Sequence, residues 1–253
     1  MRPSVANNRW IVALETSGRA GSVAVARGEH VLAVQQFTAD QRHAVELLPT
    51  VQRLCHDAGF APRQLGDVYV STGPGSFTGL RIGITVARTL AWSAGASVVA
   101  VPTLEVIAQN ALDHDPPPNA LGVVLDAKRG RIFAAPMARR GDAYQRLDEP
   151  REWEPDAFIR SLPAGAALVG DGIAYHQDAL QATGLPVLAA FLNRPRAETV
   201  HKIGRRLALA GRYDDPRTLV PLYIRRPEAE EVWDQRHTTP QPPDRTGTRD
   251  RSP

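Results

Sequence analysis

The sequence predicts an α/β protein of two related lobes, of which the second is smaller and degenerate. Each half opens with a strand that ends in a carboxylate, a tight glycine-containing turn and a second strand. These strand pairs are residues 10–14 with 21–26 and residues 121–125 with 131–137. Three consecutive prolines between the halves exclude both helix and central strand. Weak internal symmetry of this kind indicates a duplicated architecture and not a single doubly wound sheet.

The first lobe, residues 1–112, alternates strands with helices, which favours a mixed sheet with helical cover. After the hairpin we expect strands at 31–37, 68–72 and 98–101 and helices at 43–58, 80–94 and 104–111. Residues 113–119 form the linker, and residues 120–233 form the second lobe, with helices at 155–162, 172–182 and 199–210. Residues 234–253 carry no aliphatic or aromatic side chain, so we expect a disordered tail.

Composition excludes several classes of protein. Of the 253 residues, 43% are hydrophobic and 23% are charged, which excludes a wholly disordered, coiled-coil or collagen-like chain. No apolar run is long enough to span a bilayer, and the first residues lack an apolar signal core. The single cysteine, Cys55, cannot form an internal disulfide, so we expect a cytoplasmic protein with no membrane contact.

Basic charge is modest and scattered along the chain. The net charge of +3 permits contact with RNA but does not argue for it, because a dedicated binder concentrates its charge on one face. Arginine pairs occur at 139–140, 205–206 and 225–226. We expect each pair to be a solvated face and not a phosphate-binding groove.

Residues 73–83, GPGSFTGLRIG, form the most informative segment. A strand ends at Thr72, the glycines supply backbone freedom, and Thr78 is placed to cap the following helix. Free N–H groups at a helix start attract anions, yet the Walker A motif does not match, because no lysine follows the last glycine of the loop. The hydrolase elbow does not match either, so Ser76 has no support as a nucleophile.

Small residues recur at every fourth position of the following helix. They are Gly79, Gly83, Ala87, Ala91 and Gly95. Positions four apart share one helix face, so this ridge lets another backbone approach closely. That backbone belongs either to the sheet of the same lobe or to a helix of a partner chain, and the sequence leaves both open. Trp92 lies on a different face with Arg81 and Arg88, a composition typical of interface anchors.

The glycine-rich segment resembles the signature of the TsaB family, a subunit of the bacterial machinery that makes threonylcarbamoyladenosine in tRNA. Weaker matches to that family follow in the same order along nearly the whole folded chain. They are Leu14-Glu15-Thr16-Ser17, His43 with Leu47-Leu48-Pro49, Val101-Pro102-Thr103-Leu104, Leu125-Asp126-Ala127, Gly170-Asp171-Gly172 and Pro221-Leu222-Tyr223-Ile224-Arg225. The resemblance implies an actin-like (ASKHA) fold of two lobes, which agrees with the duplication.

The same resemblance implies a non-catalytic partner subunit. It would bind and stabilise the metal-bearing threonylcarbamoyltransferase subunit (TsaD type), which modifies the adenosine next to the anticodon. An ATPase subunit (TsaE type) is expected to join the assembly, and tRNA is reached only through the complex. The same surface could also pair with a second copy of the chain. The candidate interface residues are His43, Leu47, Gly79, Gly83, Ala87, Ala91 and Trp92.

The catalytic relative holds a metal ion with two histidines four positions apart on a helix, and this chain departs from that pattern. Thr103 and Ile107 occupy the two positions, and isoleucine cannot bind a metal ion. We therefore expect no catalytic residue and no metal ligand in this chain.

Actin-like ATPases also use an Asp-x-Gly turn in each lobe, and both turns are altered here. A side chain stands where glycine is expected, two residues after Glu15 and two after Asp126. We expect both carboxylates to brace turns and no cofactor to bind the chain alone. A shared adenine nucleotide at the subunit interface, near Glu15, Ser76 and Asp126, stays open. The alternatives are a free-standing ATPase or small-molecule kinase that uses Glu15, Asp126 and Asp171, and direct tRNA binding through the arginine pairs.

Overall fold

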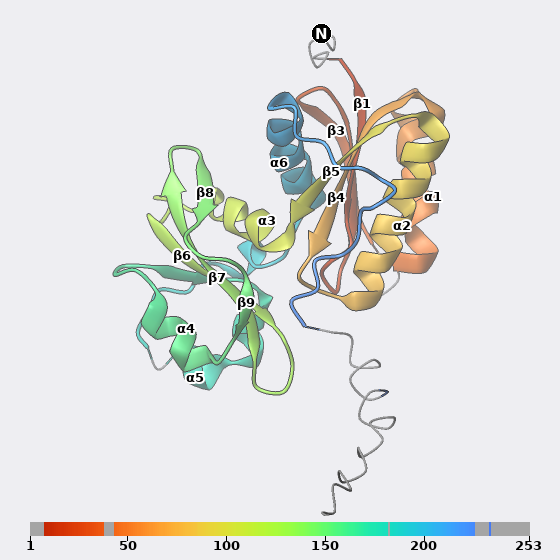
Figure 1. Cartoon of the computed structure of the whole chain (residues 1–253). Helices are drawn as coiled ribbons and strands as arrows, with labels where there is room; N and C mark the ends of the chain where they lie inside the picture. The colour runs from red at the N-terminus through yellow and green to blue at the C-terminus, as the bar shows by residue number, and fades with distance from the viewer. Residues whose placement is uncertain (1–7, 38–42, 182, 226–232, 234–253) are drawn as a thin grey trace, which may run out of the picture.

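The computed structural model describes residues 8–37, 43–181, 183–225 and 233, which form two lobes on either side of a cleft (Figure 1). The first lobe contains a five-stranded sheet in the order β3-β2-β1-β4-β5. Its strands are β1 (Trp10–Glu15), β2 (Ser22–Arg27), β3 (His30–Gln36), β4 (Leu65–Gly73) and β5 (Ser97–Pro102). The central strand β1 pairs antiparallel with β2 and parallel with β4.

Helices cover both faces of this sheet. Figure 1 shows α1 (His43–Asp57) and α2 (Phe77–Ala94) on one face and α6 (Ala197–Leu209) on the other. Residues 11–14 of β1 are all buried, and their side chains alternate between the two apolar clusters on either side of the sheet. A strand covered on both faces has no polar side to show, which explains its continuous apolar sequence.

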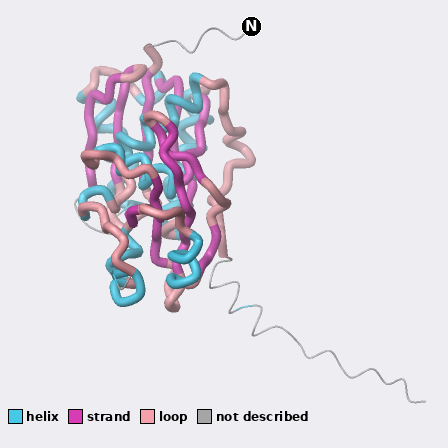
Figure 2. Tube along the Cα trace, turned by 90° about the vertical axis from the view of Figure 1, so that its left-hand side faces the viewer, coloured by secondary structure: helices cyan, strands magenta, loops and turns pink. Residues whose placement is uncertain are grey.

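The second lobe contains a smaller sheet in the order β10-β6-β7-β8, with β9 also paired to β7. Its strands are β6 (Ala120–Asp126), β7 (Ile132–Arg140), β8 (Ala143–Arg146), β9 (Arg151–Trp153) and β10 (Ala167–Val169). The short helices α4 (Pro155–Ser161) and α5 (Gln177–Gln181) pack on it. Figure 2 views the molecule from the side of the second lobe, which lies in front of the first.

The strand order confirms the predicted duplication. In the first lobe β1 pairs antiparallel with β2, which pairs with β3, and on its other side β1 pairs parallel with β4. In the second lobe β6 pairs antiparallel with β7, which pairs with β8, and on its other side β6 pairs parallel with β10. Beyond β10 the described residues add only an isolated parallel bridge between Leu168 and Val187, so the fold is a two-lobed α/β fold with a reduced second lobe.

The expected boundary of the second lobe, residues 120–233, does not hold for α6. This helix packs against β1, β2, β4 and β5 of the first sheet. Gly204 brings its backbone against the ring of Tyr69, and Val200 and Ile203 join the apolar cluster beneath β1 and β4. The chain therefore returns to the first lobe after the second has formed, because the first sheet has a second apolar face that needs cover.

Two helix predictions also differ from the structure. Residues 172–182 were expected to form one helix, but a 3₁₀ turn (Asp171–Tyr175) precedes the short α5. Gly172 lies against the backbone of Leu125, and this close approach keeps the turn tight on β6. The expected tail, residues 234–253, lies outside the described residues, and so does much of the segment before it. Among the described helices, none combines the length and apolarity that a bilayer crossing requires.

Helix α3 (Thr103–Asn110) ends at the point where the chain leaves the first lobe, and Asn110 organises that point. Its Nδ2 donates to the carbonyl O atoms of Leu192 (3.2 Å) and Arg194 (2.8 Å). Its Oδ1 accepts from Arg196 Nε (3.2 Å) and Thr199 Oγ1 (2.7 Å). All four hydrogen-bonding positions of the amide are used, so one side chain joins the outgoing and returning crossovers between the lobes.

Candidate functional site

The glycine-rich segment forms the start of α2, and Ser76 caps that helix. Ser76 Oγ accepts a hydrogen bond from Gly79 N (3.2 Å), and Ser76 N donates to Ser17 O (2.7 Å) in the β1–β2 turn. The prediction that Thr78 caps the helix is wrong, because α2 already begins at Phe77 and Thr78 is inside its first turn. The helix cap is therefore Ser76, whose hydroxyl satisfies one of the free N–H groups in the first turn of α2.

The ridge of small residues packs inside the lobe. Cβ atoms added at Gly79 and Gly83 would each come within 2.1 Å of Thr16, at its carbonyl O and its Oγ1 respectively. Ala87 and Ala91 are 0% and 4% exposed and belong to the core beneath α2. Assigning these four residues to a partner interface was wrong, because their missing volume is what lets α2 lie against the chain's own turn and sheet.

His43 and Leu47 of α1 also face inward, contrary to their expected place at the interface. Both are buried, and Leu47 belongs to the same core as Ala87. His43 Nε2 donates to the carbonyl O of Gly18 (3.1 Å), and its ring lies 5.4 Å from that of Phe37. The histidine therefore ties the start of α1 to the β1–β2 turn.

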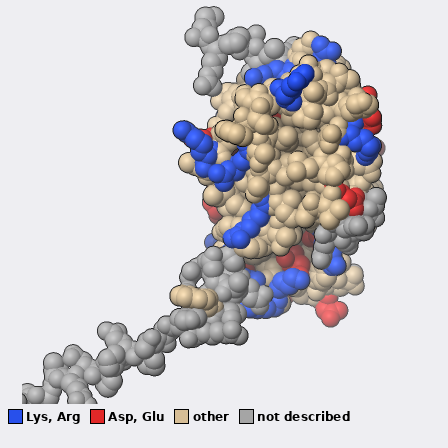
Figure 3. All heavy atoms as spheres, turned by 90° about the vertical axis from the view of Figure 1, so that its right-hand side faces the viewer, with Lys and Arg blue, Asp and Glu red and all other residues tan. Residues whose placement is uncertain are grey.

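Trp92 is the expected interface residue that the structure leaves accessible. It is 86% exposed, and on the neighbouring α1 the apolar side chains Val45 and Leu48 are 63% and 52% exposed. Figure 3 shows this side of the molecule as a broad surface with few charges and separate basic side chains. Arg53, on α1, is among the exposed basic residues of these two helices. We refer to the exposed residues of α1 and α2, among them Val45, Leu48, Arg53 and Trp92, as the outer face.

Val45 and Leu48 were not among the expected interface residues, although the sequence of α1 carries a signal for them. The buried positions of α1 follow a helical stripe, and apolar residues also occur on the opposite side of the same helix. When one apolar side of such a helix packs in the core, its other apolar side stays exposed to solvent. The outer face therefore exposes more apolar surface than was expected from the small-residue ridge of α2 alone.

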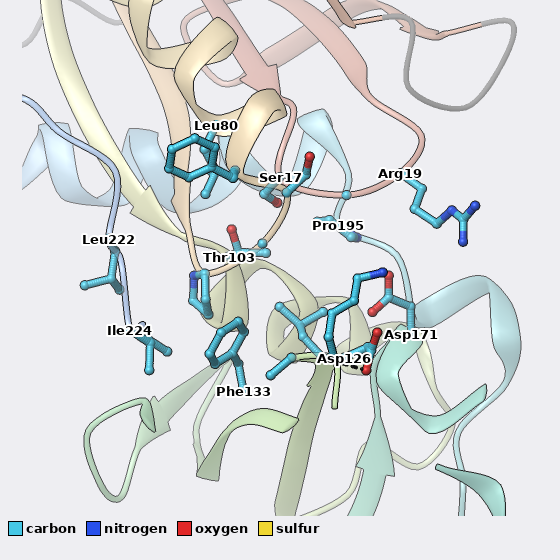
Figure 4. Close-up of a pocket in the computed structure, with 18 of the residues that line it drawn as sticks. Ser17, Arg19, Leu80, Thr103, Asp126, Phe133, Asp171, Pro195, Leu222 and Ile224 are labelled. Carbon is cyan, nitrogen blue, oxygen red and sulfur yellow. Dashed lines mark hydrogen bonds between the residues drawn. The ribbon is translucent and has the colours of Figure 1, made fainter. Parts of the chain in front are cut away.

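A second candidate site is the cleft between the lobes, with a volume of about 580 Å³. Its walls come from the β1–β2 turn, the start of α2, the β6–β7 hairpin and residues 222–225. Figure 4 shows Asp126 and Asp171 near each other on the side of the second lobe, with Leu222 and Ile224 on the other side of the cleft. Arg19 Nη1 donates to Tyr175 Oη (2.7 Å), a contact that joins the two lobes.

Glu15 does not line this cleft. It is fully buried at the end of β1, and its Oε1 accepts hydrogen bonds from the backbone N and the Oγ of Ser17. Burial raises the pKa of the Glu15 carboxyl, and the hydrogen bonds from Ser17 oppose that rise. Ser17 thus stands between the carboxylate and the cleft, at the position where an actin-like ATPase has glycine.

Asp126 and Asp171 do line the cleft and differ in their surroundings. Asp126 Oδ1 accepts from Lys128 N (3.0 Å) and from His176 Nε2 (3.1 Å), so this carboxylate braces the hairpin turn. Burial, and secondly the charge of Asp126, raises the pKa of Asp171 to about 6. Two acids of like charge therefore share one side of the cleft. In the part of the chain that the structure describes, no three His, Cys, Asp or Glu side chains gather as metal ligands.

Thr103 and Ile107 occupy the positions of the two histidines in the catalytic relative, and both are buried. Thr103 Oγ1 accepts from Gly73 N (3.2 Å), which joins α3 to the glycine-rich turn. Ile107 belongs to the core that α3 shares with the second lobe. Thr103 therefore fixes α3 to the glycine-rich turn, and Ile107 fixes it to the core of the second lobe.

The arginine pairs are not uniformly solvated, contrary to expectation. Arg205 is buried under the first sheet, and Arg225 Nη2 donates to the carbonyl O of Ala127 (2.9 Å). Arg139 Nη2 donates to Asn119 Oδ1 (3.0 Å). Arg226 lies outside the described residues. The described arginines of these pairs point to different parts of the molecule and do not form one basic groove.

Comparison with known proteins places the chain in a family. The family model described as "TsaD: tRNA N6-adenosine threonylcarbamoyltransferase" matches residues 31–233. The curated TsaB proteins of Bacillus subtilis and Escherichia coli are 29% and 28% identical to this chain. These matches cover 88% and 85% of this chain and 97% and 94% of the two relatives. Both relatives are named tRNA threonylcarbamoyladenosine biosynthesis proteins.

A solved structure supports the fold. YeaZ from Pseudomonas aeruginosa superposes with a TM-score of 0.74 at 24% identity, covering 85% of this chain and 99% of that protein. The chain therefore belongs to the family that the threonylcarbamoyltransferase model describes and, within it, to the TsaB proteins.

Proposed function

We propose that this chain is a non-catalytic subunit of tRNA threonylcarbamoyladenosine biosynthesis that binds a TsaD-type threonylcarbamoyltransferase through the outer face. The names of the curated relatives support the pathway. The observation that carries the docking surface is the 86% exposure of Trp92 on α2, together with the exposed apolar side chains Val45 and Leu48 of the neighbouring α1. An exposed tryptophan on a surface that also carries apolar side chains and arginines is typical of a binding hot spot.

The chemistry of the cleft supports a non-catalytic role. Glu15 is screened by Ser17, Ser76 is used as a helix cap, and Asp126 braces a turn. The groups that an actin-like ATPase would direct at a nucleotide are thus engaged in holding the fold. In our proposal an adenine nucleotide, where one takes part, is shared at the joint with the transferase subunit.

The proposal includes the wider assembly. A TsaE-type ATPase subunit joins the complex in the cytoplasm, tRNA is contacted through the complex, and without its partner the outer face pairs with a second copy of the chain. An isologous contact reuses one surface on both copies, so the homodimer and the heterodimer compete for Trp92.

The direct test is binding to the TsaD-type protein of the same genome, measured by calorimetry. Replacing Trp92→Ala should weaken the complex by about 30-fold or more, the usual loss at a hot spot. The matched control is Phe191→Ala, which removes an aromatic side chain of the second lobe that is 64% exposed. Equal affinities for both variants and the unchanged protein would show that the partner docks elsewhere.

A modification assay with and without this chain tests the pathway. Threonylcarbamoylation of tRNA by the partner should depend on this chain and should fall in the Trp92→Ala variant. The rival is a free-standing ATPase, favoured by the acid pair Asp126 and Asp171 in the cleft. Steady ATP turnover by the purified chain, lost in Asp126→Asn, would replace our proposal with that rival.

A further inference from the structure

The chain crosses between the lobes a third time at its end, through residues 221–225, which we call the strap. Leu222 N donates to Thr72 O (2.7 Å) at the end of β4. Tyr223 Oη accepts from Arg81 Nε (3.0 Å), and the Tyr223 ring lies 5.3 Å from that of Phe77. One end of the strap is therefore fixed to the first lobe at the start of α2.

The other end of the strap is fixed to the second lobe by Arg225. Its Nη2 donates to the carbonyl O of Ala127 (2.9 Å) in the β6–β7 hairpin, and its Nη1 lies 3.6 Å from Glu152 Oε2. The guanidinium lies 6.0 Å from the centre of the Phe133 ring. The contacts of Arg225 are thus polar contacts and a contact with an aromatic ring. None of the strap residues 221–225 belongs to the apolar core of either lobe.

The apolar cores of the two lobes are separate except at α3. The apolar clusters beneath the first sheet draw on β1, β4, α1, α2 and α6, whereas those of the second lobe draw on β6, β7 and β10. Helix α3 contributes to both and forms the hinge, with Asn110 at its end. Bodies with separate cores move relative to each other unless something holds them.

The strap is held lightly compared with the rest of the fold. Leu219 is the last residue of this segment in the core, and Val220 beyond it is 66% exposed. Leu222 and Tyr223 are also exposed in part. Release of the strap would thus break a few polar contacts without exposing a core, a change of small free-energy cost.

We propose that the strap is a releasable strut that sets the angle between the lobes and the width of the cleft. While Arg225 is hydrogen-bonded to the β6–β7 hairpin and Tyr223 to α2, the lobes stay closed around the cleft. When either of these contacts is lost, the lobes turn about α3 against the exposed hydrogen bond between Arg19 and Tyr175, and the cleft opens. The proposal concerns the isolated chain and is independent of the docking of a partner at the outer face.

The test measures the distance between the lobes in the full chain by paired spin labels. Cysteines replace the exposed residues Thr89 on α2 and Arg160 on α4, and buried Cys55 is replaced by alanine. In Arg225→Ala the distances should become longer and more widely distributed. The matched control is Arg217→Ala, because Arg217 lies in the same terminal segment and its side chain pairs with neighbouring Asp215.

Hydrogen exchange gives a second readout on the same variants. Amides of the β6–β7 hairpin, residues 125–133, should exchange about tenfold faster in Arg225→Ala, equivalent to about 1.4 kcal/mol, while those of β1 keep their wild-type rates. Distances and exchange rates equal to those of Arg217→Ala would overturn the proposal. If Arg225→Ala also loosens β1, Tyr223→Phe decides, since it removes only the oxygen that accepts from Arg81. Unchanged distances in Tyr223→Phe would then reject the strut.

Discussion

Gly83 of α2 lies directly on the side chain of Thr16: a Cβ atom at position 83 would stand 2.1 Å from Thr16 Oγ1. Thr16 is buried directly after β1, and its neighbours in the turn contact the cap of α2 and the start of α1. This one contact sets how closely the helix approaches the sheet. It also explains why small residues line that side of α2.

Replacing Gly83→Ala should destabilise the protein by about 1–3 kcal/mol, because the added methyl group overpacks a closed contact. Urea unfolding followed by circular dichroism measures the change. The control is Thr85→Ala, an exposed position on the same helix, which should leave the midpoint nearly unchanged. A Gly83→Ala protein as stable as the control would mean that α2 can move away from Thr16 at little cost.

Ser76→Ala should cost about 1 kcal/mol of stability, since the Gly79 N–H loses its side-chain acceptor. Thr78→Ala, at the second residue of the helix, should cost much less. The pair of variants separates the observed cap from the one that the sequence suggested. A larger loss in Thr78→Ala than in Ser76→Ala would contradict the assignment of the cap.

Asn110→Asp should destabilise the protein by about 2–4 kcal/mol while keeping the size of the side chain. The carboxylate presents an acceptor to the carbonyl O atoms of Leu192 and Arg194, where the amide donates. Asn119→Asp is the matched control, because Asn119 uses only its Oδ1, as acceptor for Arg139. Equal unfolding midpoints for the two variants would show that the crossover does not depend on the amide of Asn110.

Asp171 predicts a specific dependence of stability on pH. Its pKa is raised to about 6 in the folded protein, mainly by burial and then by Asp126, against Arg194 and Arg19, which lower it. Unfolded aspartate has a pKa of about 3.9. Between about pH 4 and 6 the folded state therefore binds more protons than the unfolded state, and this group's contribution to stability falls as pH rises.

Asp171→Asn should remove that contribution, because asparagine does not ionise. The stability of the variant relative to wild type should rise from pH 4 to pH 6 and level off above it. Urea midpoints across this range measure the effect, with Asp178→Asn at an exposed position of α5 as control. Parallel pH profiles for wild type and Asp171→Asn would contradict the raised pKa.

The fold could be predicted from sequence largely because its signals are local. Strands β1 and β2 and their counterparts β6 and β7 follow from apolar runs that end at glycine-containing turns. The boundary of the second lobe could not be predicted in this way. Helix α6 has an apolar stripe that would suit either sheet, and only the open face of the first sheet decided where it packs.

The candidate site was predicted in part. Trp92 was correctly set apart from the small-residue ridge, and it is exposed on the outer face. Assigning the ridge and His43 to the interface failed, because the turn at Thr16 and Gly18 and the core beneath α2, which bury these residues, come from distant parts of the chain. The sequence pattern shows that a helix has two faces that could be buried. It does not show which of them packs in the core.

The sequence by itself determined the duplicated α/β architecture, the turns and the linker marked by glycine and proline, and membership of the TsaB family. These features depend on residue order and local conformation. The tertiary structure alone decided which face of α2 reaches solvent, where α6 packs, and how the terminal strap joins Arg81 to Ala127 across the cleft. The physical reason is that burial is a property of contacts between distant segments, and a side chain's type does not record which segment will cover it.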